Sequence, residues 1–216
     1  KGQGMWIGLC DGGYDFVDKH EVFEEMYNND RLLGTRDYVN KDGNVYNGSS
    51  HGTSCLSLMA GNIPDKYVGT APLASYYLCR TEDVKSENII EEYNWVSAAE
   101  FLDSLGIDII STSLGYVDFD NSQWDHVYSD LDGKTSVITI GSEIACSRGI
   151  LCVTSAGNEG GTAFPYISVP ADAENVLTVG AVDGNGNRAP FSSVGPTYDN
   201  RIKPDVMAHG YGVIVA

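Results

Sequence analysis

The chain has 216 residues, 42% of them apolar, and a formal net charge of −17 at pH 7. This length is enough for one domain that buries about 70% of the surface its unfolded chain exposes. Because the negative charge repels polyanions at long range, we expect neither nucleic acid nor an anionic membrane as a partner. The apolar stretch 136–153 is interrupted by Glu143 and Arg148, so no segment is expected to span a membrane.

The chain has five cysteines, which cannot all pair, and no two have the spacing of metal ligands. Cys10, Cys79 and Cys152 lie inside short apolar runs that are typical of strands. The sequence therefore predicts mostly reduced, buried thiols rather than a disulfide framework or a metal site.

Short apolar runs alternate with helical patterns along the whole chain. Strands are expected at 5–10, 35–40, 74–80, 107–112, 150–154, 176–182 and 213–215, and helices at 19–27, from 51 onward, at 86–105 and at 136–148. The alternation predicts an α/β fold of three layers, in which a mostly parallel sheet carries helices on both faces.

The clearest helical pattern covers residues 86–105, where Ser86 can cap the start and Gly106 can end the helix. Apolar residues at helical spacing predict its buried stripe: Ile89, Ile90, Tyr93, Val96, Ala99, Phe101 and Leu105.

Three polar residues fall where an α/β fold places its ligands. Asp11 follows the first strand, His51 opens a helix, and Asn158 lies in a glycine-rich segment after the strand at 150–154. Each residue alone has a structural explanation, as a turn residue or part of a helix cap. Together they are an acid that orients an imidazole, the imidazole itself and an amide donor, which are three of the four parts of an acyl-transfer site. The fourth part would be a nucleophile.

Five motifs occur in the order and rough spacing of one protease family: Ile7-Gly8-Leu9-Cys10-Asp11-Gly12-Gly13, His51-Gly52-Thr53, Ser113-Leu114-Gly115, Ser155-Ala156-Gly157-Asn158-Glu159-Gly160 and Lys203-Pro204-Asp205-Val206-Met207-Ala208. Over essentially its whole length the chain resembles the subtilisin-like serine proteases, or subtilases, and most of all the secreted subtilases of gut Bacteroidetes. The resemblance implies a serine endopeptidase that works through an acyl-enzyme. In it Asp11 would orient the imidazole, His51 would carry the proton and Asn158 would donate to the oxyanion.

The same resemblance implies where a polypeptide substrate lies. The backbone of Ser113, Leu114 and Gly115 would pair with the extended substrate, although this segment could equally be an ordinary exit from a strand. Ser155, Ala156 and Gly157 would form one wall of the pocket for the residue before the scissile bond. Small side chains suit this place, because a peptide backbone must approach closely.

The family's nucleophile lies in a Gly-Thr-Ser-x-x-x-Pro segment after the Lys203-Pro204 motif, and the sequence up to Ala216 does not contain it. Ser192 and Ser193 precede that motif and resemble a structural turn. We therefore expect residues 1–216 to be a subtilisin-like peptidase domain truncated before its catalytic serine, with an incomplete fold. We expect this piece alone to be nearly inactive and unstable.

The resemblance also suggests structural calcium, although the sequence does not identify its ligands, and it implies that the chemistry needs no cofactor. It further implies a monomeric protein that is secreted or held at the cell surface and that acts on polypeptides. Cys55, one helical turn after His51, is expected to lie beneath the imidazole. Two alternatives stay open: a catalytically dead relative that binds extended peptides, and a hydrolase with Cys55 as its nucleophile.

Overall fold

The computed structural model describes residues 1–216 as a large sheet, a small hairpin and four α-helices. The strands are β1 (Trp6–Asp11), β2 (Leu32–Asp37), β3 (Asn62–Ile63), β4 (Tyr67–Val68), β5 (Ser75–Arg80), β6 (Ile109–Thr112), β7 (Leu151–Ser155), β8 (Leu177–Val182) and β9 (Val206–His209). The helices are α1 (Glu24–Asn28), α2 (His51–Ala60), α3 (Ile90–Leu105) and α4 (Val137–Ser147), with 3₁₀ turns at Glu21–Phe23, Ser122–Trp124 and Tyr128–Asp130.

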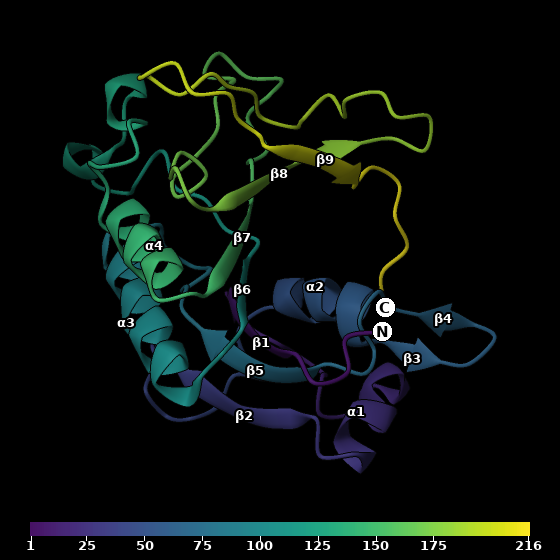
Figure 1. The fold of residues 1–216 in the computed structure, drawn as a ribbon. Coiled ribbons are helices and arrows are strands. Elements are labelled where there is room, and N and C mark those ends of the chain that lie inside the picture. The colour runs from purple at the N-terminus through teal and green to yellow at the C-terminus, as the bar shows by residue number, and fades with distance from the viewer.

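Seven strands form one sheet in the order β2-β5-β1-β6-β7-β8-β9, and every neighbouring pair is parallel (Figure 1). Strands β3 and β4 form a separate antiparallel hairpin. The predicted α/β class with a mostly parallel sheet is therefore confirmed. Since parallel strands present their carboxyl ends at one edge, the residues that follow β1, β5, β6 and β7 are brought together there.

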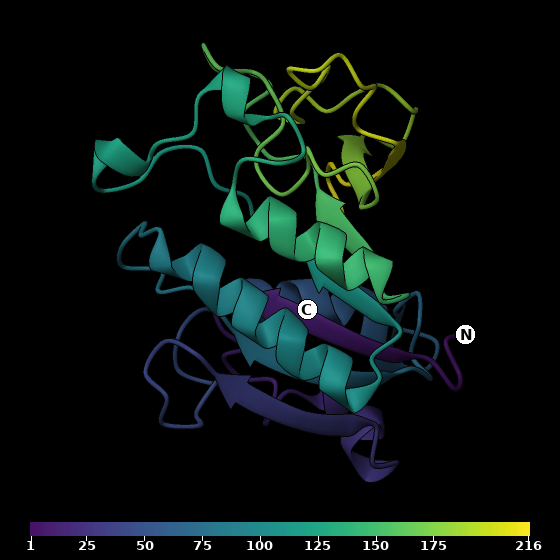
Figure 2. The ribbon, with the colours of Figure 1, turned by 60° about the vertical axis from the view of Figure 1, so that its left-hand side comes forward.

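Helices cover both faces of this sheet. Helices α3 and α4 lie side by side in front of the strands in Figure 2, with α2 behind them. Successive side chains of β1 point to opposite faces of the sheet. Leu9 packs in the hydrophobic core that contains Leu56 of α2, whereas Cys10 packs in the core that contains Trp95 of α3. This double covering makes β1 a rigid support for the residue at its end.

The predicted buried stripe of the third helix is correct at Ala99, and Ile89 and Val96 pack against the core, but the prediction is wrong at Ile90, Tyr93 and Leu105. Ile90 and Tyr93 are 55% and 50% exposed, and the buried face consists of Glu91, Glu92, Trp95, Ala98, Ala99 and Leu102. The Glu92 carboxylate is buried because His126 Nε2 lies 2.6 Å from Oε1 and the Ile138 N–H donates to Oε2 at 3.0 Å. These polar partners come from a distant loop and from the first turn of α4, so apolar spacing alone does not place Glu92 on the buried face.

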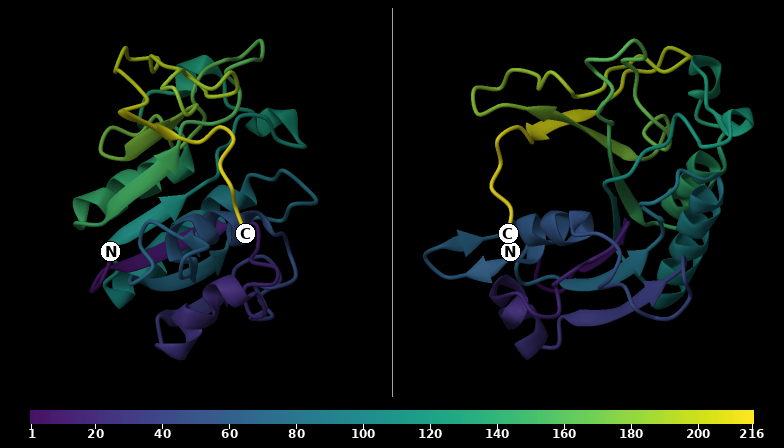
Figure 3. Two further views of the ribbon diagram at one scale, coloured as in Figure 1. Left: turned by 90° about the vertical axis from the view of Figure 1, so that its right-hand side faces the viewer. Right: turned by 180° about the vertical axis from the view of Figure 1, so that it is seen from behind.

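Several boundaries also differ from the predicted ones. The helix expected at 86–105 begins at Ile90, with no side-chain cap from Ser86. The helix expected at 19–27 is split into the 3₁₀ turn Glu21–Phe23 and α1, and the second strand covers Leu32–Asp37 rather than 35–40. The expected strand 213–215 does not exist. That segment runs from β9 back to α2, where the Ala216 N–H donates to the Ser57 hydroxyl (Figure 3).

All five cysteines are free, and Cys10, Cys79 and Cys152 are buried as predicted. Cys146, at the end of α4, is half-buried beside Cys152. A hydrogen bond from Cys152 lowers the pKa of the Cys146 thiol to about 7. No helix in the structure is both long and apolar enough to cross a membrane.

We expect Cys146 to be the first cysteine to react with iodoacetamide at pH 7, because its thiol is only half-buried and its pKa is lowered, whereas burial raises the pKa of Cys55. Peptide mapping of the labelled protein by mass spectrometry measures the order of reaction. Cys152→Ala removes the donor and should slow labelling of Cys146 severalfold. Faster labelling of Cys55 than of Cys146 would contradict the assignment.

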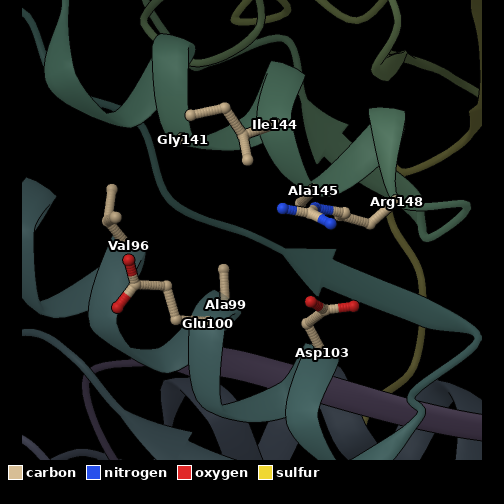
Figure 4. A pocket seen from close by; sticks show the side chains of 8 residues that line it. All are labelled: Val96, Ala99, Glu100, Asp103, Gly141, Ile144, Ala145 and Arg148. Atoms are coloured by element: carbon tan, nitrogen blue, oxygen red, sulfur yellow. The ribbon is translucent and has the colours of Figure 1, made fainter.

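A groove separates α3 from α4 on the outer surface of the helix layer (Figure 4). Its floor contains Val96 and Gly141, and a Cβ at Gly141 would lie 2.5 Å from Val96 Cγ2, so glycine permits the close approach of the two helices. Glu100 and Asp103 of α3 and Arg148 after α4 line its rim. None of the candidate catalytic residues lines this groove.

Candidate active site

Asp11 and His51 form the centre of the candidate site. Asp11 is the last residue of β1 and is 2% exposed, and His51 is the first residue of α2. The His51 Nδ1 atom lies 2.9 Å from both carboxylate oxygens of Asp11, and the Gly12 N–H donates to Oδ1 at 2.7 Å. The carboxylate thus fixes the imidazole ring and favours the tautomer with its proton on Nδ1.

Glycine allows the strand end and the helix start to meet. The Gly52 N–H donates to the Gly13 carbonyl at 3.1 Å, and a Cβ at Gly52 would lie 2.5 Å from that oxygen. A side chain at Gly52 would push α2 away from the end of β1 and separate His51 from Asp11. The His-Gly pair in the sequence therefore has a steric reason.

The surroundings of His51 suit a general base. The hydrogen bond that His51 donates to Asp11 raises the pKa of the imidazole, burial opposes this change, and the charges of Asp11 and Glu82 add to it. The His51 side chain is 54% exposed, and no protein group forms a hydrogen bond with its Nε2 atom. This nitrogen can therefore accept a proton from a group in the cleft.

Cys55 lies next to this pair. Its Sγ atom, a ring nitrogen of His51 and a carboxylate oxygen of Asp11 all lie within 4.8 Å of one another. Burial, followed by the Asp11 charge, raises the pKa of the Cys55 thiol to about 12, so the sulfur stays protonated at neutral pH. Calcium takes oxygen ligands only, so this group of side chains does not fit the calcium that the family resemblance suggests.

The segment after β7 carries Asn158 on a well-supported loop. Gly157 has φ of 105°, in the left-handed region, and the Ser193 hydroxyl holds the next turn by accepting from the Glu159 N–H at 2.9 Å and donating to Oε2 of Glu159 at 2.8 Å. Ser192 and Ser193 are both 1% exposed, in agreement with a structural turn. The Asn158 side chain is exposed and has no hydrogen-bond partner in the protein.

The segment after β6 leaves its backbone free. Tyr116 forms a bridge with Val169, but no backbone group of Ser113, Leu114 or Gly115 forms a hydrogen bond with another backbone group. A Cβ at Gly115 would lie 2.0 Å from the Ser168 hydroxyl, so only glycine fits there. The three residues therefore offer unpaired backbone groups to an added strand.

One cleft contains most of the predicted site residues. It is lined by Asp11, His51, Ser113, Leu114, Gly115 and Asn158, together with Gly12, Glu82, Val84 and Glu87. The predicted Ser155, Ala156 and Gly157 do not line it: Ser155 ends β7, and Ala156 is 1% exposed. Glu82 and Glu87 had not been singled out from the sequence. The available signal was their position just after the strand at 74–80, which ends beside β1.

The comparisons with known proteins identify the family. The Subtilase family model matches residues 2–215, and the chain belongs to this family. The chain is 31% identical over 228 residues to serine protease AprX of Bacillus subtilis, and the aligned region covers 99% of this chain and 48% of AprX. It is 32% identical over 186 residues to subtilisin NAT of Bacillus subtilis subsp. natto, and the aligned region covers 84% of this chain and 42% of that protein. The chain thus spans about half or less of the length of these two relatives.

Solved structures share the fold at lower sequence identity. The prenylagaramide maturation protease PagA matches with a TM-score of 0.69 at 21% identity, covering 98% of this chain and 65% of PagA. The patellamide maturation protease PatA matches with a TM-score of 0.68 at 22% identity, covering 97% of this chain and 66% of PatA. Both likenesses support the α/β architecture described above.

Proposed function

We propose that the protein containing this chain is a serine endopeptidase that cleaves peptide bonds through an acyl-enzyme. The observation that carries the proposal is the Asp11–His51 pair, in which a buried carboxylate fixes an imidazole whose Nε2 faces a cleft without a protein partner. Membership of the subtilase family supports the same reaction class.

In the proposed mechanism His51 moves the proton. Its Nε2 atom takes the proton of a serine hydroxyl as the oxygen attacks the substrate carbonyl, and then gives that proton to the leaving amine. Asp11 stabilises the imidazolium that forms between these steps, and a water molecule then releases the acyl group by the same route. The Asn158 amide would donate a hydrogen bond to the oxyanion of each tetrahedral intermediate.

We propose that the nucleophilic serine lies outside residues 1–216. Ser113 is the one hydroxyl residue that lines the cleft, but its hydroxyl lies beside the Cys55 thiol and makes no hydrogen bond with His51. The unpaired backbone of Ser113–Gly115 supports pairing with an extended polypeptide, and Ser155–Gly157 would back the adjoining pocket. By the same family resemblance we propose a secreted or cell-surface monomer with structural calcium.

A fluorophosphonate probe tests the reaction class. We expect the full-length protein to be labelled on one serine and His51→Ala to abolish labelling, because the hydroxyl then has no base. Mass spectrometry of the labelled peptide locates the nucleophile. If the intact, folded protein is not labelled and cleaves no peptide, the endopeptidase proposal fails.

Asn158→Ala is expected to lower kcat about 10²-fold to 10³-fold with little change in KM, because the lost donor acts mainly on the transition state. Steady-state cleavage of a fluorogenic peptide measures both constants. Asn185→Ala, in an exposed turn, is the matched control and should keep full activity. An unchanged kcat for Asn158→Ala would remove this residue from the mechanism.

Two other functions use the same cleft. A relative that binds extended peptides without cutting them is consistent with the imidazole of His51, which forms no hydrogen bond with a serine hydroxyl within residues 1–216. The hydrolase with Cys55 as nucleophile is disfavoured, since the attacking species is the thiolate and the pKa of Cys55 is raised to about 12.

A further inference from the structure

One wall of the candidate cleft is unusually acidic. Glu82 and Glu87 line the cleft, and the charge of Glu91, in the first turn of α3, acts on Glu82. We refer to these three residues as the acidic wall. None of them forms an ion pair with a lysine, arginine or histidine. The wall therefore places carboxyl groups together with no cation of the protein to balance them.

The surroundings of these carboxyl groups make their negative charge costly. Burial raises the pKa of Glu82 to about 8, and the negative charges of Asp11, Glu91 and Glu87 act in the same direction. Burial likewise raises the pKa of Glu91 to about 7 and shifts that of Glu87 upward. A cation that enters the cleft would stabilise the ionised forms.

A buried tyrosine lies against the wall. Tyr116 is fully buried, and its hydroxyl makes no hydrogen bond of normal geometry. Burial, followed by the charges of Glu82 and Glu91, raises the pKa of Tyr116, and Glu82 is the one side chain that interacts with its hydroxyl, so the hydroxyl is directed at the acidic wall. A buried hydroxyl without a well-formed hydrogen bond is uncommon, and its single proton cannot balance several carboxylates.

The acidic wall lies next to the catalytic pair. A Cβ built on Gly12 would lie 3.6 Å from Oε2 of Glu82, and Gly12 follows Asp11 directly. The Thr81 N–H donates to the Asp11 carbonyl at 3.0 Å, which holds the segment after β5 against the end of β1. The charge of Glu82 also contributes to the raised pKa of His51. A group bound by Glu82 would therefore lie within a residue or two of the reacting bond.

We propose that Glu82 and Glu87 bind a lysine or arginine side chain of the polypeptide substrate close to the scissile bond. This inference rests on the proposed endopeptidase function and adds the substrate class to it. A guanidinium or ammonium group brings several N–H donors that can reach two separated carboxylates at once.

A divalent cation fits the acidic wall less well. Calcium needs six to eight oxygen ligands that converge at about 2.3–2.6 Å. The single group of three His, Cys, Asp or Glu side chains whose ligand atoms converge is Asp11, His51 and Cys55, and it contains no glutamate of the wall. Because the carboxylates of the acidic wall do not converge on one point, they suit a long flexible side chain with several donors better than a single metal ion.

The test compares peptides that differ by one charge. Pairs of internally quenched peptides carry arginine or citrulline, which has the same shape without the charge, at each of the positions near the cleaved bond. We expect arginine at one position to raise kcat/KM of the full-length protein about 10-fold to 100-fold over citrulline. Glu82→Gln should reduce this ratio to below about threefold, and Glu87→Gln should reduce it partly.

Glu100→Gln is the matched control, because Glu100 is an exposed glutamate on the outer groove of α3. It should leave the arginine preference unchanged. If the protein cleaves arginine and citrulline peptides equally, or if Glu82→Gln keeps the preference, the inference is overturned while the endopeptidase proposal stands.

Binding separates the two proposals when no peptide is cleaved. Fluorescence anisotropy with labelled arginine and citrulline peptides measures affinity in the full-length His51→Ala variant. Tighter binding of the arginine peptide by about tenfold or more, lost in the His51→Ala/Glu82→Gln variant, would support the acidic wall even if catalysis fails. Calorimetric Ca²⁺ binding that Glu82→Gln abolishes, with no arginine preference, would overturn the inference in favour of a metal site.

Discussion

Replacing His51 with alanine in the full-length protein is expected to lower kcat about 10⁶-fold, the size of the effect for the corresponding base in subtilisin. The reason is geometric: Nε2 of His51 is fixed toward the cleft by two 2.9 Å contacts between Nδ1 and the Asp11 carboxylate. Without the imidazole, no neighbouring group can take the proton of a serine hydroxyl. Cleavage of a fluorogenic peptide, followed under single-turnover conditions, measures the residual rate.

The control for His51→Ala is His209→Ala. His209 is also an exposed histidine, but it ends β9 and interacts only with the Tyr211 carbonyl at 3.1 Å. We expect this variant to keep nearly full activity. A loss of less than about 100-fold in His51→Ala would show that another base does the work, and the proposed mechanism would then be wrong.

The sequence predicted the class of fold and the proximity of Asp11 and His51 because both depend on short-range patterns. An apolar run that stops at Asp11-Gly12 marks the end of a strand, and an apolar run that begins at His51-Gly52 marks the start of a helix. Parallel strands bring their carboxyl ends, and the helix starts that follow them, to one edge of the sheet. The sequence separation of 40 positions between Asp11 and His51 does not obscure this relation. The distances and the hydrogen bond from Gly12 could come only from the structure.

The face of α3 could not be predicted in the same way. Apolar spacing predicts that Ile90 and Tyr93 are buried, but the buried face instead contains Trp95 and Glu92. The Trp95 Nε1–H donates to the Thr112 hydroxyl at 3.0 Å, and the Glu92 carboxylate binds His126. Thr112 and His126 lie 17 and 34 positions further along the chain than the helix residues that they bind. A buried carboxylate is tolerated only when such partners exist, and a single sequence does not reveal them.

The acidic wall was missed for a related reason. A run with Glu82, Asp83 and Glu87 has the composition of a solvated loop, and a net charge of −17 makes acidic loops common in this chain. The structure distinguishes Glu82 by its position against Gly12 and by the buried Tyr116 hydroxyl beside it. Burial and orientation, rather than composition, separate a binding carboxylate from a solubilising one.

Asp11→Asn is expected to lower kcat about 10⁴-fold, less than His51→Ala because the base remains. An amide at this position can donate a hydrogen bond to Nδ1 of His51, which places the imidazole proton on Nε2, where it prevents proton uptake. Peptide cleavage measured from pH 5 to pH 9 gives both the loss of rate and its pH dependence. Asp65→Asn, in the exposed turn between β3 and β4, is the matched control.

The pH profile makes this prediction specific to the Asp11–His51 pair. The hydrogen bond that His51 donates to Asp11 raises the pKa of the imidazole above its usual value. Because the base must be neutral to act, the wild-type rate falls as the pH drops through that raised pKa. Asparagine carries no charge, so the pKa of His51 falls and the acidic limb of kcat/KM moves to lower pH. An acidic limb that stays in place would mean that a different group titrates, and Glu82, with its pKa raised to about 8, would be the next to test.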